Sequence, residues 1–245
     1  MKKEILVIGD SCRDIYIYCD SNRLAPDVPV PVLNVLYQNE NGGMASNVFR
    51  NIQPKVSGTR LVTNDNWYSI TKTRYVHKGT NHTFFRVDSS QEIKRIKLED
   101  IDFDYKIIVI SDYDKGFLLD EDIEYICSNH PDVFIDSKKI LGPWASKSKY
   151  IKINNHEYNR SKEFITKDLE DKIICTVGEE GCNFRGKNYP VKKVEVIDVS
   201  GAGDSFMAGL VVEYLRSEDV EKSIKFANEC SSNVVQHPGV TIIDF

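Results

Sequence analysis

The chain has 245 residues, of which 41% are hydrophobic and 28% are charged, so it is long enough to bury a core and is ordinary in composition for a globular protein in water. Its formal net charge of −5 gives no reason to expect nucleic acid or an acidic membrane as a partner, because both attract a basic face. The first apolar run, residues 5–8, is too short for a secretory signal or a membrane span, and the six cysteines contain no CxxC pair, which predicts a cytoplasmic protein with free thiols.

Short runs of β-branched residues alternate along the chain with longer helical patterns. Buried strands are expected at 4–8, 106–110, 133–136, 150–153 and 173–177, with a further strand at 194–198. Helices are expected at 43–52, 119–129, 203–216 and 220–236. Because strands that alternate with helices form a parallel sheet covered on both faces, the pattern predicts an α/β fold.

Two pairs of strand-like segments interrupt this alternation. The first pair is 14–19 and 30–37, and the second is 73–77 and 82–87, on either side of a turn at 78–81. Four such strands predict a small sheet, drawn from about 12–37 and 72–88, that projects from the main body. No linker or repeat indicates a second unit, so we expect residues 1–245 to form a single domain.

Glycines lie between an expected strand and an expected helix in the segment Asp198-Val-Ser-Gly-Ala-Gly-Asp204. Around Gly201, Ala202 and Gly203 the backbone N–H groups at the helix start would point at one spot, with the positive end of the helix dipole behind them, and would form an anion hole. Asp204 at the mouth of that hole suits a hydroxyl that loses its proton beside a phosphoryl group in transfer. Taken alone, a first-turn acid that stabilises its helix by about 0.3–1 kcal/mol explains the motif as well.

Two common nucleotide-binding motifs are absent. The first expected strand is followed by Ile8-Gly-Asp-Ser-Cys12, which has one glycine where a dinucleotide-binding fold has GxGxxG, and no GxxxxGK[ST] segment occurs in the chain. The sequence therefore argues against a hydride-transfer enzyme and against a P-loop ATPase.

Taken in order, motifs along nearly the whole chain resemble the ribokinase-type (PfkB) carbohydrate kinases, and most of all the branch that phosphorylates D-glycero-D-manno-heptose 7-phosphate. Arg23-Leu-Ala-Pro-Asp-Val-Pro-Val-Pro-Val32 is similar to the Arg-Ile-Ser-Pro-Glu-Ala-Pro-Val-Pro-Val stretch of that branch, and Ser111-Asp-Tyr-Asp-Lys-Gly116 resembles its Ser-Asp-Tyr-x-Lys-Gly loop. The resemblance implies a ribokinase-like three-layer sandwich, with a mostly parallel central sheet and a small β-sheet lid.

On the acceptor side, Gly42-Gly43 followed by Asn47 resembles the first family signature, in which the sugar approaches the glycine backbone and the asparagine bonds a hydroxyl. The substrate-binding residues that the resemblance implies are Asp10, Asp14, Gly42, Gly43, Asn47, Arg74, Arg86, Asp88, Asp112 and Lys115. For an acceptor that already carries a phosphate, Arg74, Arg86 and Lys115 are the candidate partners, since arginine holds phosphate through two hydrogen bonds.

On the nucleotide side, three short motifs resemble the family pattern: Asp136-Ser-Lys138, Asn154-Asn-His-Glu157, and Thr176-Val-Gly178 with Gly181. The resemblance implies that ATP is bound by Lys138, Asn154, Thr176, Gly178, Gly181 and Asn228. It also implies that Asn154 and Glu157 position Mg²⁺ through water, that Asp204 is the catalytic base, and that Gly201, Ala202 and Gly203 stabilise the transferred group. Each residue alone is more often a loop, cap or surface residue, and only their shared order favours a site.

The sequence is shorter than is usual in this family. Residues 51–56 pass almost directly into 61–65, and the usual Val-Gly-x-Asp segment with its neighbouring strand and helix is missing, which predicts the loss of part of the sheet and of one wall near the sugar pocket. We expect an ATP-dependent kinase for a sugar or sugar phosphate that pairs as a homodimer through the lid, whose open edges need cover. The alternatives left open are an inactive, kinase-like ligand-binding or regulatory protein, and a kinase for a nucleoside or another alcohol.

Overall fold

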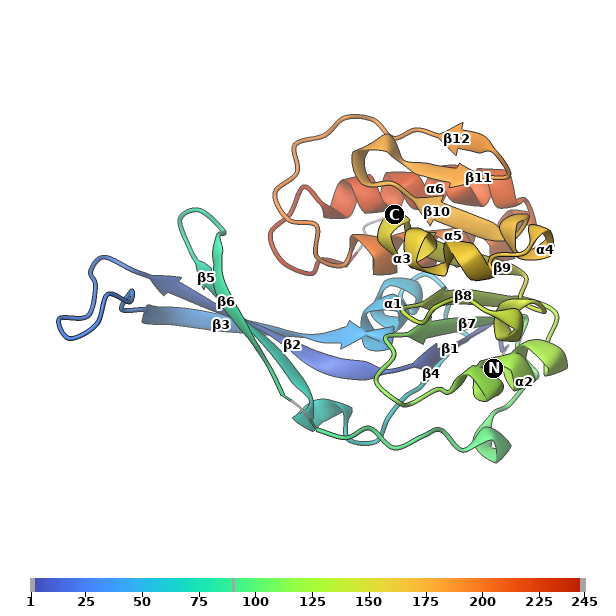
Figure 1. The fold of residues 1–245 in the computed structure, drawn as a ribbon, viewed down its shortest axis with the longest axis horizontal. Coiled ribbons are helices and arrows are strands. Elements are labelled where there is room, and N and C mark those ends of the chain that lie inside the picture. Colours follow the sequence, from blue (N-terminus) through green and yellow to red (C-terminus); the bar gives the residue numbers. More distant parts are fainter. Residues whose placement is uncertain (1–2, 90, 243–245) are drawn as a thin grey trace.

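The computed structural model describes residues 3–89 and 91–242, which form two sheets (Figure 1). The strands of the larger sheet are β1 (Ile5–Gly9), β4 (Thr59–Val62), β7 (Ile107–Asp112), β8 (Val133–Ser137), β9 (Tyr150–Asn154), β10 (Ile173–Thr176), β11 (Cys182–Phe184) and β12 (Lys187–Tyr189). Their order is β12-β11-β10-β9-β8-β7-β1-β4. Every pair from β4 to β10 is parallel, whereas β11 and β12 add an antiparallel hairpin, so the expected mostly parallel sheet is confirmed.

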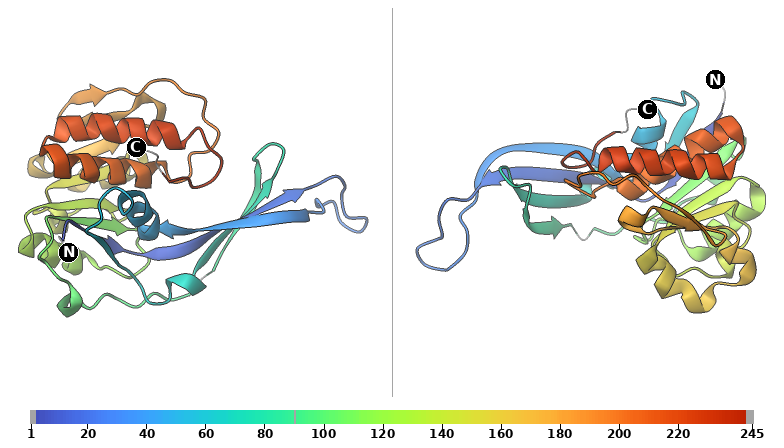
Figure 2. Two further views of the ribbon diagram at one scale, coloured as in Figure 1. Left: turned by 180° about the vertical axis from the view of Figure 1, so that it is seen from behind. Right: turned by 90° about the horizontal axis from the view of Figure 1, so that it is seen from above.

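Helices cover both faces of the larger sheet. They are α1 (Ala45–Ile52), α2 (Asp120–Asn129), α3 (Asn155–Ser161), α4 (Lys167–Glu170), α5 (Ala202–Ser217) and α6 (Val220–Val234). Because successive strand side chains point to opposite faces, Ile5 and Val7 pack in the cluster that contains α1, α5 and α6, while Leu6 and Ile8 pack in the cluster that contains α2. Figure 2 shows α5 and α6 side by side on one face. The three-layer sandwich is therefore confirmed.

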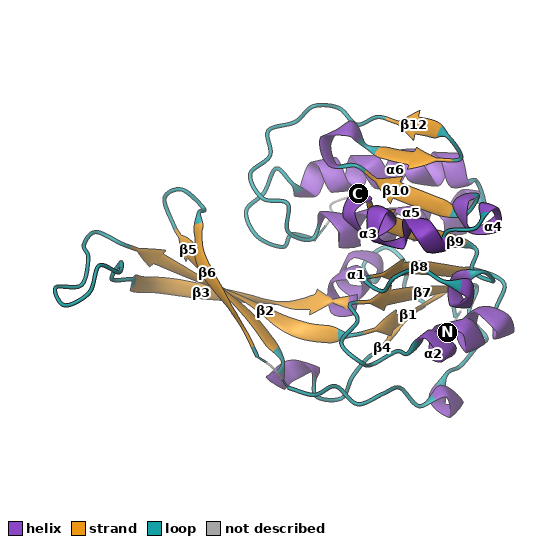
Figure 3. Ribbon diagram, viewed as in Figure 1, coloured by secondary structure: helices purple, strands orange, loops and turns teal. Residues whose placement is uncertain are grey.

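The smaller sheet, called the lid sheet below, projects from the sandwich (Figures 1 and 3). Its strands are β2 (Ser11–Asp20), β3 (Asn34–Met44), β5 (Thr71–His77) and β6 (Thr83–Asp88), in the order β3-β2-β5-β6. Only Asp10 separates β1 from β2, so one stretch of chain runs from the core into the lid sheet. The inner face of the lid sheet carries Asp14, Tyr16, Lys72, Arg74 and Arg86, as the strand registers show. This face is turned toward the sandwich, because Tyr16 packs against Val240.

Two expected elements differ from the structure. The strand expected at 194–198 is wrong, because the backbone N–H groups of Ile197 and Asp198 donate to the carbonyl of Val235 (2.8 and 3.2 Å) and hold this irregular segment along the end of α6. The strand expected at 30–37 begins only at Asn34 and continues to Met44. Pro31 lacks the N–H group that a strand ladder needs, which explains the later start.

The region of the expected deletion is compact. Residues 53–58 connect α1 to β4, which lies at one end of the strand order and pairs with β1. The buried side chain of Asn64, just after β4, accepts a hydrogen bond from the N–H of Ser11 (2.8 Å) and so ties the connection to the base of the lid sheet. Within the described residues, no helix has both the length and the apolar character that a membrane span requires.

Candidate active site

The first turn of α5 holds the Gly-Ala-Gly-Asp segment. Gly201, which precedes the helix, has a φ of 80°, a left-handed conformation that glycine adopts without strain. A Cβ atom at Gly203 would lie 2.8 Å from the Nζ of Lys152, so the absence of a side chain lets a buried lysine approach the start of the helix. Asp204, one residue further on, is 6% exposed. The helix N-terminus and Lys152 therefore direct positive charge at the place where Asp204 lies.

Two side chains from distant parts of the sequence bond the Asp204 carboxylate. The Nδ2 of Asn47, on α1, donates to Oδ2 (2.7 Å), and the hydroxyl of Tyr113, in the loop after β7, donates to Oδ1 (2.7 Å). Burial raises the pKa of Asp204 above its ordinary value, and the two hydrogen bonds act against that rise. Asn47, expected to bond a sugar hydroxyl, is thus found on the carboxylate itself. Each carboxylate oxygen keeps a lone pair for another donor.

A cluster of two acids and two lysines lies at the ends of β8 and β9. Asp136 bonds Lys152 through Oδ2 (2.7 Å) and Lys138 through Oδ1 (3.3 Å), and Lys138 also pairs with Glu157 (2.6 Å). Burial would lower the pKa of Lys138, but Asp136 and Glu157 outweigh it and raise the pKa. Burial likewise opposes the charge of Asp136, and the two lysines hold its pKa below the ordinary value. The four side chains therefore form one connected ion-pair cluster close to Asp204.

Asn154 and Glu157 cap the first turn of α3. The Oδ1 of Asn154 accepts from the N–H of Glu157 (2.9 Å), and the Oε2 of Glu157 accepts from the N–H of Asn154 (2.8 Å), while the Oε1 of Glu157 lies on Lys138. No group of three or more His, Cys, Asp or Glu side chains suited to a metal is found among the residues described. This donor set fits a Mg²⁺ ion that is carried by nucleotide phosphates and reached through water, and it does not fit an all-protein cage.

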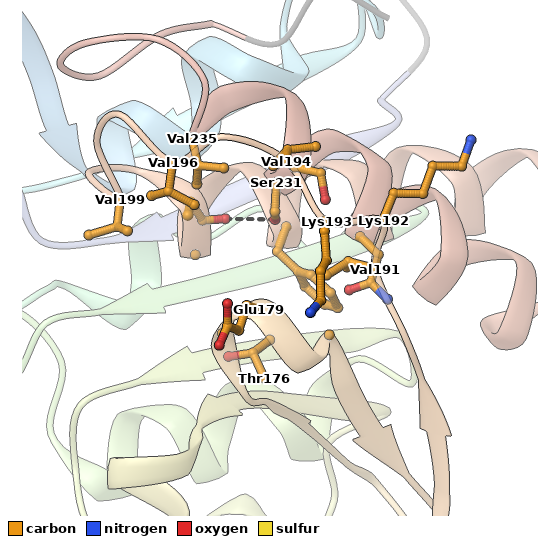
Figure 4. A pocket seen from close by; sticks show the side chains of 17 residues that line it. Thr176, Glu179, Val191, Lys192, Lys193, Val194, Val196, Val199, Ser231 and Val235 are labelled. Carbon is orange, nitrogen blue, oxygen red and sulfur yellow. Dashed lines mark hydrogen bonds between the residues drawn. The ribbon is translucent and has the colours of Figure 1, made fainter.

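A cavity of about 330 Å³ is bounded by the end of β10, the segment 191–199, the start of α5 and the final turns of α6 (Figure 4). Its 17 lining residues include five valines and four of the residues expected to bind the nucleotide, namely Thr176, Gly178, Gly181 and Asn228. The side-chain amide of Asn228 already has a partner in the structure, because its Nδ2 donates to the carbonyl of Tyr189 (2.9 Å). Ala202 and Gly203 line the same cavity, so it reaches the start of α5. An apolar slot that ends at an anion hole suits a base followed by phosphates.

The inner face of the lid sheet gathers the expected acceptor residues. Arg74 bonds Asp14 (3.0 Å), and the Asp14 carboxylate fills the space beside Gly43, where a Cβ atom would lie 2.4 Å from Oδ2. Arg74 is directly opposite Arg86 in the β5–β6 register, and Arg86 pairs with Asp88 (2.8 Å). Gly42 lies near the end of β3 and is opposite Arg13 in the β2–β3 register. A second cavity, between this face and segment 196–200, is lined by Tyr16, Arg74, Asp198 and Gly239 among others.

Asp10 and Asp112, both expected to bind substrate, hold a loop in the structure. Both are fully buried, and the Asp10 oxygens accept from the N–H groups of Tyr113 (2.7 Å) and Phe117 (3.3 Å). Asp112 accepts from the hydroxyl of Ser137 (2.5 Å), and burial raises its pKa to about 7. Lys115, in the same loop, is exposed and lines neither of the two cavities described above.

Two residues near Asp204 were missed by the sequence interpretation. Tyr113 lies inside the motif Ser111–Gly116, but nothing local to that motif indicates that its hydroxyl reaches a carboxylate 91 positions away. Lys152 could have been identified from the sequence, since it is the single charged residue within the apolar run of β9. A lysine in a buried strand needs a partner, and here the partner is Asp136.

Solved structures define the fold class. The ribokinase of Thermotoga maritima superposes with a TM-score of 0.72 at 19% sequence identity, over 97% of this chain and 94% of that chain. At this level of identity the similarity establishes a ribokinase-like fold.

The sequence defines the family. A model of the pfkB family carbohydrate kinases matches residues 60–244, and the chain therefore belongs to the pfkB family of carbohydrate kinases. The bifunctional protein HldE of Helicobacter pylori strain J99 is 26% identical over 298 positions, which cover 97% of this chain and 64% of that protein. HldE of Campylobacter jejuni strain RM1221 is 28% identical over 293 positions, covering 100% and 63%. The chain thus spans less than two thirds of the length of these relatives. Both alignments contain more positions than the chain has residues, so the relatives include segments that it lacks.

Proposed function

We propose that this carbohydrate kinase transfers the γ-phosphoryl group of ATP to a hydroxyl of a sugar phosphate, with Asp204 as the general base. The observation that carries the proposal is the position of Asp204. It follows Ala202 and Gly203, which line the apolar cavity, and it bonds Asn47 at the foot of the lid sheet. A carboxylate between a nucleotide-sized cavity and a projecting charged sheet lies where a phosphoryl group and an acceptor hydroxyl would meet.

The electrostatics of the site support proton transfer to Asp204. Burial raises its pKa, which makes the carboxylate a stronger base than an exposed aspartate, and the hydrogen bonds from Asn47 and Tyr113 favour its ionised form. In the proposed reaction the acceptor hydroxyl gives its proton to Asp204 as its oxygen bonds the γ-phosphorus, and the bond from that phosphorus to the bridging oxygen breaks and releases ADP. The N–H groups at the start of α5 stabilise the phosphoryl oxygens, and Lys152, next to Gly203, adds a fixed positive charge.

Mg²⁺ bound to the nucleotide supplies positive charge across the phosphates. Asn154 and Glu157 would hold it through water, as their direct partners in the structure are each other and Lys138. Lys138 would then approach the phosphates from the same side.

The arginines of the lid sheet favour an acceptor that already carries a phosphate group. Arg74 and Arg86 are directly opposite each other on the inner face of the sheet, where like charges repel and a bound anion would reduce the repulsion. Asp14 and Asp88 pair with one guanidinium each, and N–H groups on both guanidinium groups remain for a phosphate. This cationic pair favours a sugar phosphate over a neutral sugar or a nucleoside.

Exposed apolar side chains on the outer face of the lid sheet favour the formation of a homodimer. Phe85 and Val87 lie on this face and are 48% and 51% exposed, and the ring of Phe85 stacks on Tyr75 (4.7 Å). An apolar face of this kind is covered in a stable protein, and a second copy of the chain would cover it. Phe85→Lys should convert a dimer into a monomer in analytical ultracentrifugation, and a monomeric wild-type chain at micromolar concentration contradicts this proposal.

An assay of ADP release over a panel of sugars, sugar phosphates and nucleosides tests the function. We expect turnover with a sugar phosphate and a decrease in kcat of about 10²- to 10⁴-fold in Asp204→Asn, with ATP binding preserved. Turnover restricted to nucleosides overturns the acceptor class. Absence of turnover with every acceptor, while ATP still binds, supports a ligand-binding role instead.

A further inference from the structure

The hydroxyl of Tyr113 is the second of the two donors that bond the Asp204 carboxylate. An aspartate carboxylate rotates about its last side-chain bond with broad freedom, so a single hydrogen bond leaves its plane poorly fixed. Asn47 bonds Oδ2 and Tyr113 bonds Oδ1, both at 2.7 Å, and together they hold both oxygens. The family signatures account for Asn47 and Asp204, whereas no role is yet given to Tyr113.

The position of Tyr113 is fixed from several sides. Its backbone N–H donates to the buried Asp10 carboxylate (2.7 Å), which anchors the start of the loop after β7. Its ring lies 5.0 Å from the Nζ of Lys72 on the lid sheet and 5.4 Å from the Nζ of Lys138 in the sandwich. Ammonium groups at these distances are attracted to the ring. Tyr113 is therefore placed between the lid sheet, the acid–lysine cluster and Asp204.

The direction of the Tyr113–Asp204 hydrogen bond is also fixed. Burial, and then the negative charge of Asp204, raise the pKa of Tyr113 well above its ordinary value, so the phenol keeps its proton. It acts as a donor to Asp204, and the carboxylate accepts.

We propose that Tyr113 is a positioning residue for the reaction: its hydroxyl fixes the plane of the Asp204 carboxylate, so that a free lone pair faces the acceptor hydroxyl. The inference rests on the proposed function, because it assigns Tyr113 its role through Asp204. Asp10 contributes indirectly, since its carboxylate bonds the backbone N–H of Tyr113 and so fixes the position from which the side chain extends. The role is distinct from substrate binding, and it predicts an effect on kcat more than on KM.

A titration that needs no acceptor gives the first test. In the full chain labelled with ¹³C at the aspartate carboxyl carbons, the Asp204 signal is identified by its loss in Asp204→Asn, and its midpoint is followed by NMR against pH. Tyr113→Phe removes only the hydroxyl, and a lost hydrogen bond to a charged group should raise the Asp204 midpoint by about one to two pH units. Tyr158→Phe is the matched control, because the Tyr158 hydroxyl bonds Glu170 and not Asp204, and its loss should leave the midpoint unchanged. An unchanged midpoint in Tyr113→Phe overturns the inference.

Kinetics give the second test, with ATP and the sugar phosphate of highest turnover in the panel above. Tyr113→Phe should lower kcat roughly 10- to 100-fold with little change in KM, and should move the acidic limb of the pH profile upward. An increase in kcat contradicts the inference, because it shows that the hydroxyl blocks the acceptor. If Asp204→Asn keeps full turnover, the proposed function fails. If Asp204→Asn is inactive while Tyr113→Phe matches wild type in midpoint and kcat, only the inference fails. If Tyr113→Phe does not fold, Tyr113→Leu, which has neither the hydroxyl nor another hydrogen-bond donor in its side chain, takes its place in both measurements.

Discussion

The charged groups around Asp204 are buried and tightly paired, whereas some of those on the inner face of the lid sheet are exposed to solvent. Asp136 and Lys152 are 2% and 3% exposed, and each has a protein partner at hydrogen-bond distance. The side chains of Arg86 and Asp88 are 51% and 40% exposed, and their pair faces solvent. Buried pairs are costly to break, while exposed pairs contribute little and rearrange easily. The groups of the proposed phosphoryl-transfer site are therefore held by the fold before any ligand binds, whereas the Arg86–Asp88 pair of the proposed acceptor site is free to rearrange around a ligand.

The largest effect should follow from breaking the buried cluster. Asp136→Ala leaves Lys138 and Lys152 without their shared acid, and should lower the free energy of unfolding by about 3–5 kcal/mol. Asp88→Ala, which breaks the exposed pair, should change it by about 0–1 kcal/mol. Urea denaturation of both variants measures the difference, and equal losses would contradict the contrast between the two regions.

A smaller effect is expected on the rate. Lys152→Met removes the fixed charge next to Gly203 and should lower kcat by roughly 10²-fold, the magnitude typical for the loss of one preorganised donor. Lys147→Met, at an exposed lysine, serves as the control. Single-turnover rates at saturating ATP and acceptor make the comparison, and an unchanged rate in Lys152→Met shows that the lysine is structural only.

Substitutions on the inner face of the lid sheet should change the KM for the acceptor. Arg86→Glu reverses one charge of the Arg74–Arg86 pair, and the KM for a sugar phosphate should rise about 10-fold or more, since a charge-assisted hydrogen bond is replaced by repulsion. The KM for a neutral sugar should change far less. Steady-state kinetics with both acceptors provide the test, and equal changes would exclude a phosphate site on the lid sheet.

The smallest effect concerns pH. Burial raises the pKa of Asp112 to about 7, so the folded protein holds a proton there that the unfolded chain releases at lower pH. The stability from this group is fully present below the ordinary pKa of an aspartate and is lost as the pH rises toward 7. Asp10, Lys139 and Ser137 are the groups that face Asp112. Asp112→Asn should flatten the decline in thermal stability between about pH 4 and 7, and an identical pH profile in the variant would refute this assignment.

Much of the fold could be predicted from local pattern. The apolar runs of β1, β7 and β8 are buried on both faces, and such runs are recognisable without a structure. The segment 194–198 has a similar pattern for another reason. Its valines line the nucleotide-sized cavity, and Val196 is 54% exposed, so the β-branched residues there form a cavity wall and not a buried strand. Periodicity does not distinguish these two uses of valine.

The candidate site was predictable only in part. Asp204 and Asn154 lie in motifs whose order along the chain indicates a site, but motif order does not reveal which side chains meet. The contacts of Asp204 with Asn47 and Tyr113 join residues 157 and 91 positions apart. The motifs of Asp10 and Asp112 likewise do not reveal their partners in the structure, which are backbone N–H groups for Asp10 and the Ser137 hydroxyl for Asp112. Tertiary placement decides both cases.

Whether Asp204 is the base is decided by the single-turnover rate of phosphoryl transfer in Asp204→Asn, measured together with the Kd for ATP of the same variant. The account predicts a rate lower by about 10²- to 10⁴-fold and an unchanged Kd, because the substitution removes the base and keeps the fold of α5. Asp168→Asn, at an exposed aspartate on α4, should match wild type in both. A rate in Asp204→Asn within a few-fold of wild type would show that the acceptor hydroxyl loses its proton elsewhere, and would contradict the account.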